Sequence, residues 1–156
     1  MIIERGRLED MEGINRLLRQ VLMVHHEGRP DIFKADVKKY TDEELVTIIK
    51  DDSRPVFVAH SETGEVMGYA FCICQQHVNH NVLTDIKTLY IDDLCVDETV
   101  RGQHIGKQLY DYVLAFAKEQ DFYNVTLNVW SCNEGAMKFY EKCGLKPQKV
   151  GMEVIL

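Results

Sequence analysis

The chain has 156 residues, enough for one domain spanning residues 1–156, because two smaller cores would each be marginal. Apolar residues make up 46% of the sequence and charged residues 28%, which excludes an intrinsically disordered chain. The net charge is −7 and the basic residues are scattered, so nucleic acid is not expected as the main partner. No apolar run reaches about eighteen residues and the N-terminal segment is unlike a secretion signal, so we expect a cytoplasmic protein without a membrane partner.

The N-terminal part of the sequence predicts a short strand and one amphipathic helix. Residues 2–3 form the strand. From Leu8 onward, apolar residues recur at intervals of three and four, which indicates a helix with one buried face. The residues of this face are Met11, Ile14, Leu18, Val21 and Leu22. The helix is expected to fray near residues 25–26, because Gly28 and Pro30 interrupt the pattern.

A second helix and a hairpin are predicted next. Thr41 and Glu44 form a capping-box pair, which is typical of the start of a helix. Residues 56–60 and 66–75 are expected to form an antiparallel hairpin, because a Glu-Thr-Gly-Glu turn lies between them. A long strand is expected over residues 86–96.

The C-terminal part predicts two more helices and further strands. The strongest helical pattern covers residues 104–119, and a strand follows over residues 125–130. A helix over residues 134–142 is expected to end at Gly144 in a left-handed conformation. A final strand is expected over residues 149–156, with a glycine that permits a bend. The predicted fold is α/β (α+β), with three layers and a mixed, mostly antiparallel sheet of about seven strands flanked by about four helices.

The segment between the long strand and the strongest helix carries the chemistry. Arg101, Gly102 and Gly106 stand in a short loop and in the first helical turn. The first turn of a helix leaves backbone N–H groups unpaired and carries a partial positive charge. Glycines let this backbone approach an anion closely, and Arg101 and Lys107 add positive charge. The segment therefore predicts a binding site for a diphosphate, with a tight turn of structural origin as the alternative.

This segment lacks the Gly-Lys-Ser/Thr ending of a nucleotide-hydrolysing loop. It resembles instead the Arg/Gln-x-x-Gly-x-Gly/Ala coenzyme A signature of the GNAT superfamily of N-acetyltransferases. Here the signature reads Arg101-x-x-His104-x-Gly106, and Leu94-x-Val96 precedes it. His104 replaces the first glycine of the signature, so we expect an altered rather than a lost affinity for the coenzyme.

A second block resembles the same family. It reads Asn133-Glu134-x-Ala136-x-x-Phe139-Tyr140. In the family an Asn opens this helix, and Asn133 is also a good N-cap on physical grounds. The resemblance implies a GNAT-like fold, acetyl-CoA as co-substrate and no metal. The residues that it assigns to the coenzyme are Leu94, Cys95, Val96, Arg101, Gly102, Gln103, His104, Ile105, Gly106, Lys107 and Asn133.

The resemblance also implies residues for catalysis and acceptor binding. Tyr140 would protonate the leaving thiolate, unless it is an ordinary core aromatic residue. Asp92 is the first candidate to accept the amine proton and Asp93 to bind the ammonium group, with a solvated acidic strand face as the alternative. Strand alternation places these two neighbours on opposite faces unless a bulge re-aims one of them. Glu27 is a further candidate for binding the amine, and Cys95 is expected to be a buried structural thiol.

Within the superfamily, residues 90–94 and the loop that follows look most like the spermidine/spermine and thialysine N-acetyltransferases. The resemblance therefore implies transfer of an acetyl group from acetyl-CoA to a primary amine of a small, cationic acceptor, by direct attack in a ternary complex. Acetylation of a protein lysine or N-terminus is one alternative, and a non-catalytic acyl-CoA-binding module is another. A homodimer is expected because GNAT proteins often form one.

Overall fold

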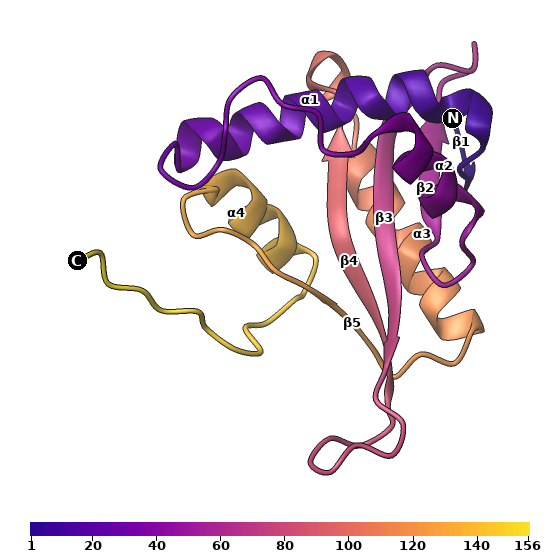
Figure 1. Ribbon diagram of the computed structural model, residues 1–156. Helices are drawn as coiled ribbons and strands as arrows, with labels where there is room; N and C mark the ends of the chain where they lie inside the picture. The colour runs from indigo at the N-terminus through magenta and orange to yellow at the C-terminus, as the bar shows by residue number, and fades with distance from the viewer.

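The computed structural model describes residues 1–156 and contains a five-stranded sheet and four α-helices (Figure 1). The strands are β1 (Ile2–Arg5), β2 (Val56–His60), β3 (Val66–Gln76), β4 (Lys87–Val96) and β5 (Asn124–Leu127). The helices are α1 (Met11–Gly28), α2 (Asp42–Lys50), α3 (Ile105–Glu119) and α4 (Glu134–Lys142), with two short 3-10 helices, η1 (Leu8–Asp10) and η2 (Glu98–Val100). The strand order is β1-β2-β3-β4-β5, and neighbours are antiparallel except β4 and β5, which are parallel.

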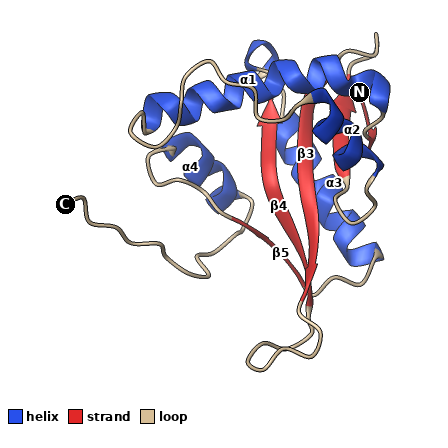
Figure 2. Ribbon diagram, in the orientation of Figure 1, coloured by secondary structure: helices blue, strands red, loops and turns tan.

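Helices cover both faces of the sheet, which gives the expected three layers (Figure 2). One core packs α1 and α2 against the sheet and contains Val56 and Val58 of β2. Because side chains alternate along a strand, Phe57 and Ala59 point to the other face, where they meet α3. Phe139 of α4 also packs against the core on the α3 side.

α1 is longer than the sequence predicts. Fraying is expected at His25 and His26, but the helix continues to Gly28. The Arg29 N–H donates to the His25 carbonyl at 2.9 Å, and the His26 ring Nδ1 lies 2.7 Å from the Phe33 carbonyl oxygen. These contacts satisfy polar groups at the helix end, so the prediction of fraying is wrong.

The sheet has five strands rather than about seven, and the predicted final strand is among those missing, because the C-terminal segment (residues 149–156) pairs with no strand. The segment is extended but runs away from the sheet (Figure 1). Val150, Met152 and Val154 alternate along it and are 73%, 88% and 81% exposed. A strand requires hydrogen bonds from a neighbouring edge, and the path of the segment meets no edge of its own sheet. The prediction of a final strand within this chain is therefore wrong.

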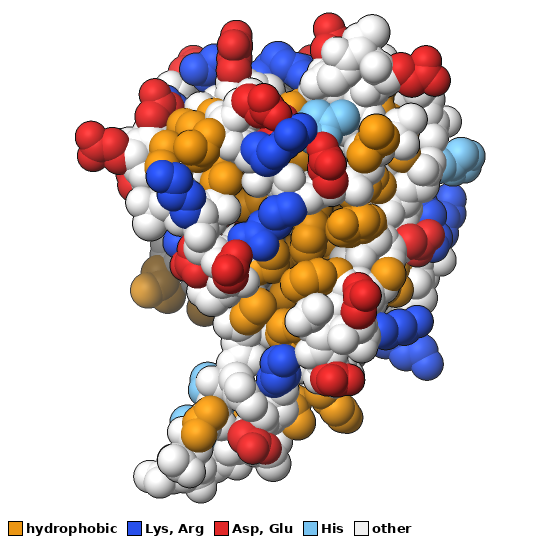
Figure 3. Space-filling model, turned by 90° about the vertical axis from the view of Figure 1, so that its right-hand side faces the viewer, with side chains coloured by type: hydrophobic (Ala, Val, Ile, Leu, Met, Phe, Trp, Pro, Cys, Tyr) orange, Lys and Arg blue, Asp and Glu red, His pale blue; other side chains and the backbone are white.

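The surface is mixed in character where it can be followed in the figures. None of the four α-helices combines the length and the apolar character needed to cross a membrane. On the side of the molecule nearest β1, Lys and Arg side chains are interspersed with Asp and Glu around a band of hydrophobic side chains (Figure 3). This face therefore carries no continuous basic stripe.

Candidate active site

A bulge interrupts β4 at its acidic pair. Ile91 lies opposite Cys72, and Asp93 lies opposite Phe71, the residue next to Cys72 in β3. Asp92 therefore has no partner on β3. One extra residue in a strand bends it and changes the direction of the side chains that follow. The opposite-face arrangement that simple alternation predicts for Asp92 and Asp93 does not apply here.

The bulge changes which face of the sheet the side chains in the second half of β4 point to. Leu89 and Ile91, before the bulge, belong to the core on the α3 side, whereas Cys95, after it, belongs to the core on the α1 side. Asp93 also points to the α1 side, because its carboxylate accepts a 2.8 Å hydrogen bond from the hydroxyl of Tyr69, a residue of that core. The acidic pair thus lies on the face covered by α1.

The loop between α1 and α2 brings a cation to this pair. The Lys39 Nζ lies 3.7 Å from Oδ2 of Asp92 and 3.9 Å from Oδ2 of Asp93. One ammonium group within 4.0 Å of both carboxylates means that the two side chains converge on one place. Lys39 was not predicted from the sequence, because a lysine in a loop without a motif gives no local signal.

Burial controls the protonation of the groups around Asp93. Burial raises the pKa of Asp93, and the Lys39 charge and the Tyr69 hydrogen bond oppose this only in part. The pKa of Tyr140 is raised as well, first by burial and then by the Asp93 charge, so its hydroxyl keeps its proton at neutral pH. Burial lowers the pKa of His25, which favours the neutral ring. Asp93 therefore lies within electrostatic reach of both Tyr140 and His25.

β4 and β5 diverge at the bulge and leave part of β4 unpaired. Their parallel pairing ends with Ile91 opposite Leu127, and the strands then separate (Figure 1). Residues 94–96 of β4 pair with β3 on one side and have no strand on the other. Unpaired N–H and C=O groups at a strand edge can bind an extended ligand as an added strand would.

α4 packs near this open edge through Phe139. The Asn133 side chain accepts a 3.2 Å hydrogen bond from the Ala136 N–H, which confirms the predicted N-cap. A Cβ placed on Gly106 would lie 3.4 Å from Phe139 of α4 and 3.5 Å from Val96 of β4. The first turn of α3, the end of β4 and α4 therefore converge around Gly106, where an added Cβ would be in van der Waals contact with both neighbours.

The loop before α3 adopts the left-handed backbone conformation at two positions. The φ angle is 86° at Gly102 and 60° at His104, which is the N-cap of α3. The conformation at His104 explains why the signature prefers glycine there. Among the residues assigned to the coenzyme, Ile105 is buried, and Lys107 pairs with Asp111 along α3. The exposed members of the set are Arg101, Gly102, Gln103, His104 and Lys107.

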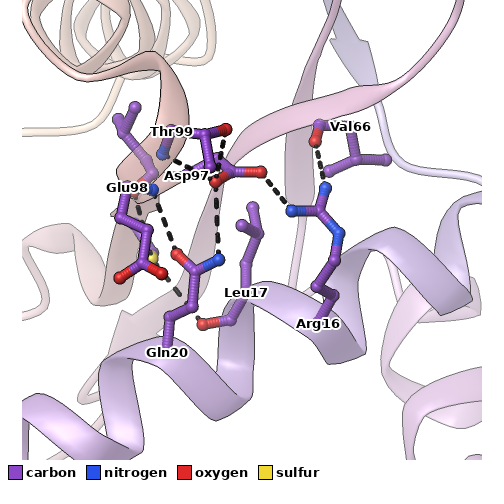
Figure 4. Close-up of polar contacts among 9 residues, drawn as sticks. Arg16, Leu17, Gln20, Val66, Asp97, Glu98 and Thr99 are labelled. Carbon is purple, nitrogen blue, oxygen red and sulfur yellow. Dashed lines mark hydrogen bonds and ion pairs between the residues drawn. The ribbon is translucent and has the colours of Figure 1, made fainter.

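Asp97 ties the start of this loop to α1 (Figure 4). Its buried carboxylate accepts hydrogen bonds from the backbone N–H and the hydroxyl of Thr99, both at 3.0 Å, and from Arg16 and Gln20 of α1. Arg16 also donates to the Val66 carbonyl at 2.8 Å. Burial alone would raise the pKa of Asp97, but these hydrogen bonds lower it to about 2. The network fixes η2 just before the coenzyme loop, and sequence reasoning missed it.

A hollow of about 390 Å³ opens between the end of α1 and the start of α4. It is lined by Val24, His25, Glu27, Gly28, Phe33, Trp130, Cys132, Asn133, Glu134 and Gly135. Glu27, an expected acceptor contact, lies here rather than at the acidic pair. His25 links the two regions, because the charge of Asp93 acts on its pKa. The rings of Phe33 and Trp130 meet edge to face at 5.2 Å. A hollow of this volume suits a small ligand.

The Cys95 thiol is not suited to carry an acyl group. The residue is only 6% exposed, and its Sγ donates weakly to the Leu17 carbonyl at 3.7 Å. Burial raises the pKa of the Cys95 thiol to about 12, so the reactive thiolate is scarce at neutral pH. Elsewhere in the chain, no group of three or more His, Cys, Asp and Glu side chains is placed to hold a metal ion.

Comparison with known sequences identifies the family. Residues 21–145 match the family model described as Acetyltransferase (GNAT) family. The chain is 28% identical over 144 residues to peptidyl-lysine N-acetyltransferase YjaB of Salmonella typhimurium, and this match covers 92% of this chain and 82% of that protein. It is 25% identical over 118 residues to glucosamine 6-phosphate N-acetyltransferase of Arabidopsis thaliana, and this match covers 75% of this chain and 68% of that protein.

Solved structures share the fold. A tetramutant of the BH1408 protein from Bacillus halodurans has a TM-score of 0.95 and 30% sequence identity, over 100% of both chains. The aminoglycoside acetyltransferase meta-AAC0020 from an uncultured soil metagenomic sample has a TM-score of 0.75 and 24% identity, over 99% of this chain and 95% of that chain. The second likeness is one of fold alone.

The chain belongs to the GNAT acetyltransferase family. It transfers an acetyl group to an amine and uses acetyl-CoA as co-substrate. The three-layer α/β fold and the four helices are confirmed, with the strand count corrected to five. The particular likeness to spermidine/spermine and thialysine acetyltransferases, and the roles of individual residues, stay predictions.

Proposed function

We propose that this chain acetylates a primary amine of a small, cationic acceptor by direct attack in a ternary complex with acetyl-CoA. The observation that carries the proposal is the convergence of Asp92 and Asp93 on one ammonium group, that of Lys39. A carboxylate pair with this geometry suits another primary ammonium group, such as that of an acceptor.

Two proton transfers have candidate groups within electrostatic reach of each other. An amine with a pKa near ~10 is protonated at neutral pH and must lose a proton before it attacks. The sequence favours Asp92 for this role, but the raised pKa of Asp93 makes it the better proton acceptor. The Asp92 side chain is 29% exposed against 9% for Asp93, which suits Asp92 for binding the ammonium group. Tyr140 would protonate the leaving thiolate, since its hydroxyl keeps its proton.

We assign acetyl-CoA to the open edge of β4 and the loop before α3. The backbone of Leu94, Cys95 and Val96 would pair with the extended pantetheine arm in the manner of an added strand. The amides at the start of α3 would bind the diphosphate, where the partial positive charge of the helix favours an anion. The other residues of this assignment are Arg101, Gly102, Gln103, His104, Ile105, Gly106, Lys107 and Asn133.

Charge favours a cationic acceptor over a phosphorylated sugar. Glu27 and Glu134 line the hollow, and Asp92 and Asp93 converge nearby on the face covered by α1. A cluster of carboxylates attracts cations and repels a phosphate group. The substrate in the name of the Arabidopsis relative, glucosamine 6-phosphate, is therefore disfavoured here. Polyamine-type acceptors, which the resemblance to the spermidine/spermine and thialysine enzymes implies, fit these charges.

A peptidyl lysine is the second candidate acceptor. It is favoured by the relative named peptidyl-lysine N-acetyltransferase, which matches 92% of this chain. A lysine side chain carries the same ammonium group as a polyamine, so the acidic pair would suit both. A peptide also needs space for its backbone beside the reactive amine, which a small acceptor does not need.

A thiol-release assay with acetyl-CoA tests the proposal. The panel contains spermidine, lysine, an aminoglycoside, glucosamine 6-phosphate and lysine-containing peptides. We expect the highest kcat/KM with a small polycation. Preferred turnover of glucosamine 6-phosphate would contradict the cationic acceptor, and preferred turnover of peptides would favour the second candidate.

We also propose that the chain forms a homodimer through its C-terminal segment. Val150, Met152 and Val154 give this segment one apolar face, which is exposed in a single chain. β5 ends the strand order, so its outer edge is unpaired. Each copy thus offers both an apolar strand sequence and an open edge, and two copies can exchange them reciprocally. Within one chain, the segment contacts the end of α1 through an ion pair between Arg29 and Glu153.

A further inference from the structure

We propose that Lys39 is an intramolecular competitor for the ammonium group of the acceptor, and that it sets which cations the enzyme accepts. The inference rests on the proposed function, because it requires the acceptor amine to bind at Asp92 and Asp93. It goes beyond that function by assigning acceptor selectivity to the loop between α1 and α2.

Lys39 forms a partly buried ion pair with both carboxylates of the acidic pair. Its Nζ lies 3.7 Å and 3.9 Å from the two carboxylates, and its side chain is 31% exposed. The carboxylate of Asp93 has a second partner, the Tyr69 hydroxyl at 2.8 Å, which fixes its orientation. Lys39 thus places a primary ammonium group beside the pair, the same functional group that the proposed acceptor carries.

Tyr40 holds Lys39 near the pair, and the Lys39 Nζ also lies 5.4 Å from the centroid of the Tyr40 ring. Tyr40, the next residue, stacks on Phe71 of β3 with ring centroids 6.0 Å apart. Lys38, the preceding residue, pairs with Asp42 at the start of α2. Tyr40 therefore anchors the backbone next to Lys39, whereas the exposed ion pair of Lys38 with Asp42 does not involve Asp92 or Asp93. The long lysine side chain has enough rotatable bonds to leave the pair when another cation arrives.

The charges imply a competition that depends on the acceptor. Two carboxylates face one ammonium group, and a second ammonium group entering the same place is repelled by the first. A tethered competitor acts at a high effective concentration, so it weakens the binding of every acceptor that uses this place. An acceptor with several positive charges has further contacts with Glu27 and Glu134 of the hollow and can displace Lys39 more readily.

The test compares Lys39→Met with the wild type in thiol-release kinetics. Methionine keeps most of the side-chain volume and removes the charge. We expect the KM for spermidine to fall roughly two- to fivefold, because exposed and half-exposed ion pairs have strengths of this order. The KM for acetyl-CoA should stay unchanged. An unchanged or raised KM for spermidine would overturn the proposal.

Matched variants separate competition from a general charge effect. Lys38→Met removes the same charge from the same loop but not from the pair, so its KM for spermidine should equal that of the wild type. Lys39→Arg keeps the charge and should also resemble the wild type. Equal effects of Lys38→Met and Lys39→Met would contradict a specific role of Lys39.

Calorimetry with spermidine in the absence of acetyl-CoA provides a readout that does not depend on turnover. If spermidine is bound but not acetylated, the proposed function fails, while tighter binding by Lys39→Met still supports the competition. If spermidine is acetylated and Lys39→Met changes neither KM nor affinity, the proposed function stands and the role of Lys39 fails. Thermal melting of each variant establishes that the fold is intact.

Discussion

At the scale of single residues, the Tyr140 hydroxyl combines burial with the nearby charge of Asp93, and both raise its pKa. A hydroxyl that holds its proton can donate it to a thiolate formed beside it. We expect Tyr140→Phe to lower kcat by about 10²- to 10⁴-fold, the usual contribution of a general acid, and to leave the Kd of acetyl-CoA nearly unchanged. Thiol release measures kcat, and calorimetry measures Kd.

Tyr123→Phe is the matched control, because Tyr123 is 72% exposed and takes no part in the proposed site. It should have the kcat of the wild type. Full turnover by Tyr140→Phe would remove Tyr140 from the role of acid. If the wild type binds acetyl-CoA and no tested amine causes release of the thiol, the result would favour a non-catalytic acyl-CoA-binding module instead.

His104 has a backbone conformation that L-residues adopt at a cost. Its φ of 60° lies in the left-handed region, where a Cβ is disfavoured by about 1 kcal/mol. We therefore expect His104→Gly to be more stable than His104→Ala by about 1 kcal/mol in chemical denaturation. Both variants lack the imidazole, so their difference isolates the backbone. Equal stabilities would mean that position 104 does not keep this conformation in solution.

At the scale of elements, the link between η2 and α1 depends on one buried carboxylate. The pKa of Asp97 is lowered from an ordinary 3.8 to about 2 by its hydrogen bonds, against the effect of burial. A lowered pKa stabilises the folded state above the unfolded-state pKa, and the contribution disappears as pH falls from about 4 to about 2. At neutral pH the contribution is about 2 kcal/mol.

Asp97→Asn should therefore lower the free energy of unfolding by about 2 kcal/mol at pH 7. The difference from the wild type should shrink as the pH falls through the window between about 4 and about 2. Urea denaturation at several pH values measures it. Glu98→Gln is the control, because the Gln20 side chain contacts the backbone of Glu98 and not its carboxylate. A pH-independent difference would contradict the role given to the Asp97 charge.

Local signals in the sequence were sufficient for most elements of the fold. Thr41 and Glu44 form both bonds of the predicted capping box, each at 3.1 Å, and α2 begins at Asp42, directly after Thr41. Gly144 has the predicted left-handed conformation, with a φ of 92°. Caps and periodic apolar faces act over a few residues, so they can be read from the chain itself.

The acceptor side of the site could not be predicted in the same way. The bulge at Asp92 is a property of the pairing between β3 and β4, and the sequence of β4 alone does not contain it. Lys39 reaches the acidic pair across more than fifty positions of sequence through a loop without a motif. The coenzyme loop was predicted because its residues are consecutive, whereas the acceptor side is assembled from distant segments.

At the scale of the whole molecule, the C-terminal segment offers a clear test of assembly. We expect the full chain to have twice its 18.1-kDa mass in light scattering coupled to gel filtration. A double variant, Val150→Asp with Val154→Asp, should shift the protein to the monomer, because charges on the apolar face oppose burial. Lys149→Gln, on the other face of the same segment, should stay dimeric. A monomeric wild-type chain at micromolar concentration would refute the exchange.

The incorrect prediction of a final strand follows from the same feature. Val150, Met152 and Val154 alternate with Gly151 and Glu153 as in a half-buried strand. Alternation indicates that a segment is suited to a sheet, but it does not say which sheet. The number of strands in the sheet of one chain therefore cannot be counted from its apolar pattern alone.

The bulge in β4 makes the active site depend on an odd or even count of residues. In a regular strand, Ile91, Asp93 and Cys95 would all face the same way, and the extra residue puts the last two out of phase with the first. If residues 91–93 all paired with β3 without the bulge, the carboxylate at position 93 would turn toward the apolar layer under α3 and leave the Tyr69 hydroxyl without its acceptor. Deleting Asp92 would instead keep Asp93 opposite Phe71, but the acidic pair would lose one of its two carboxylates. The number of residues in β4 that pair with β3 thus decides whether Asp93 points to the acceptor side of the sheet.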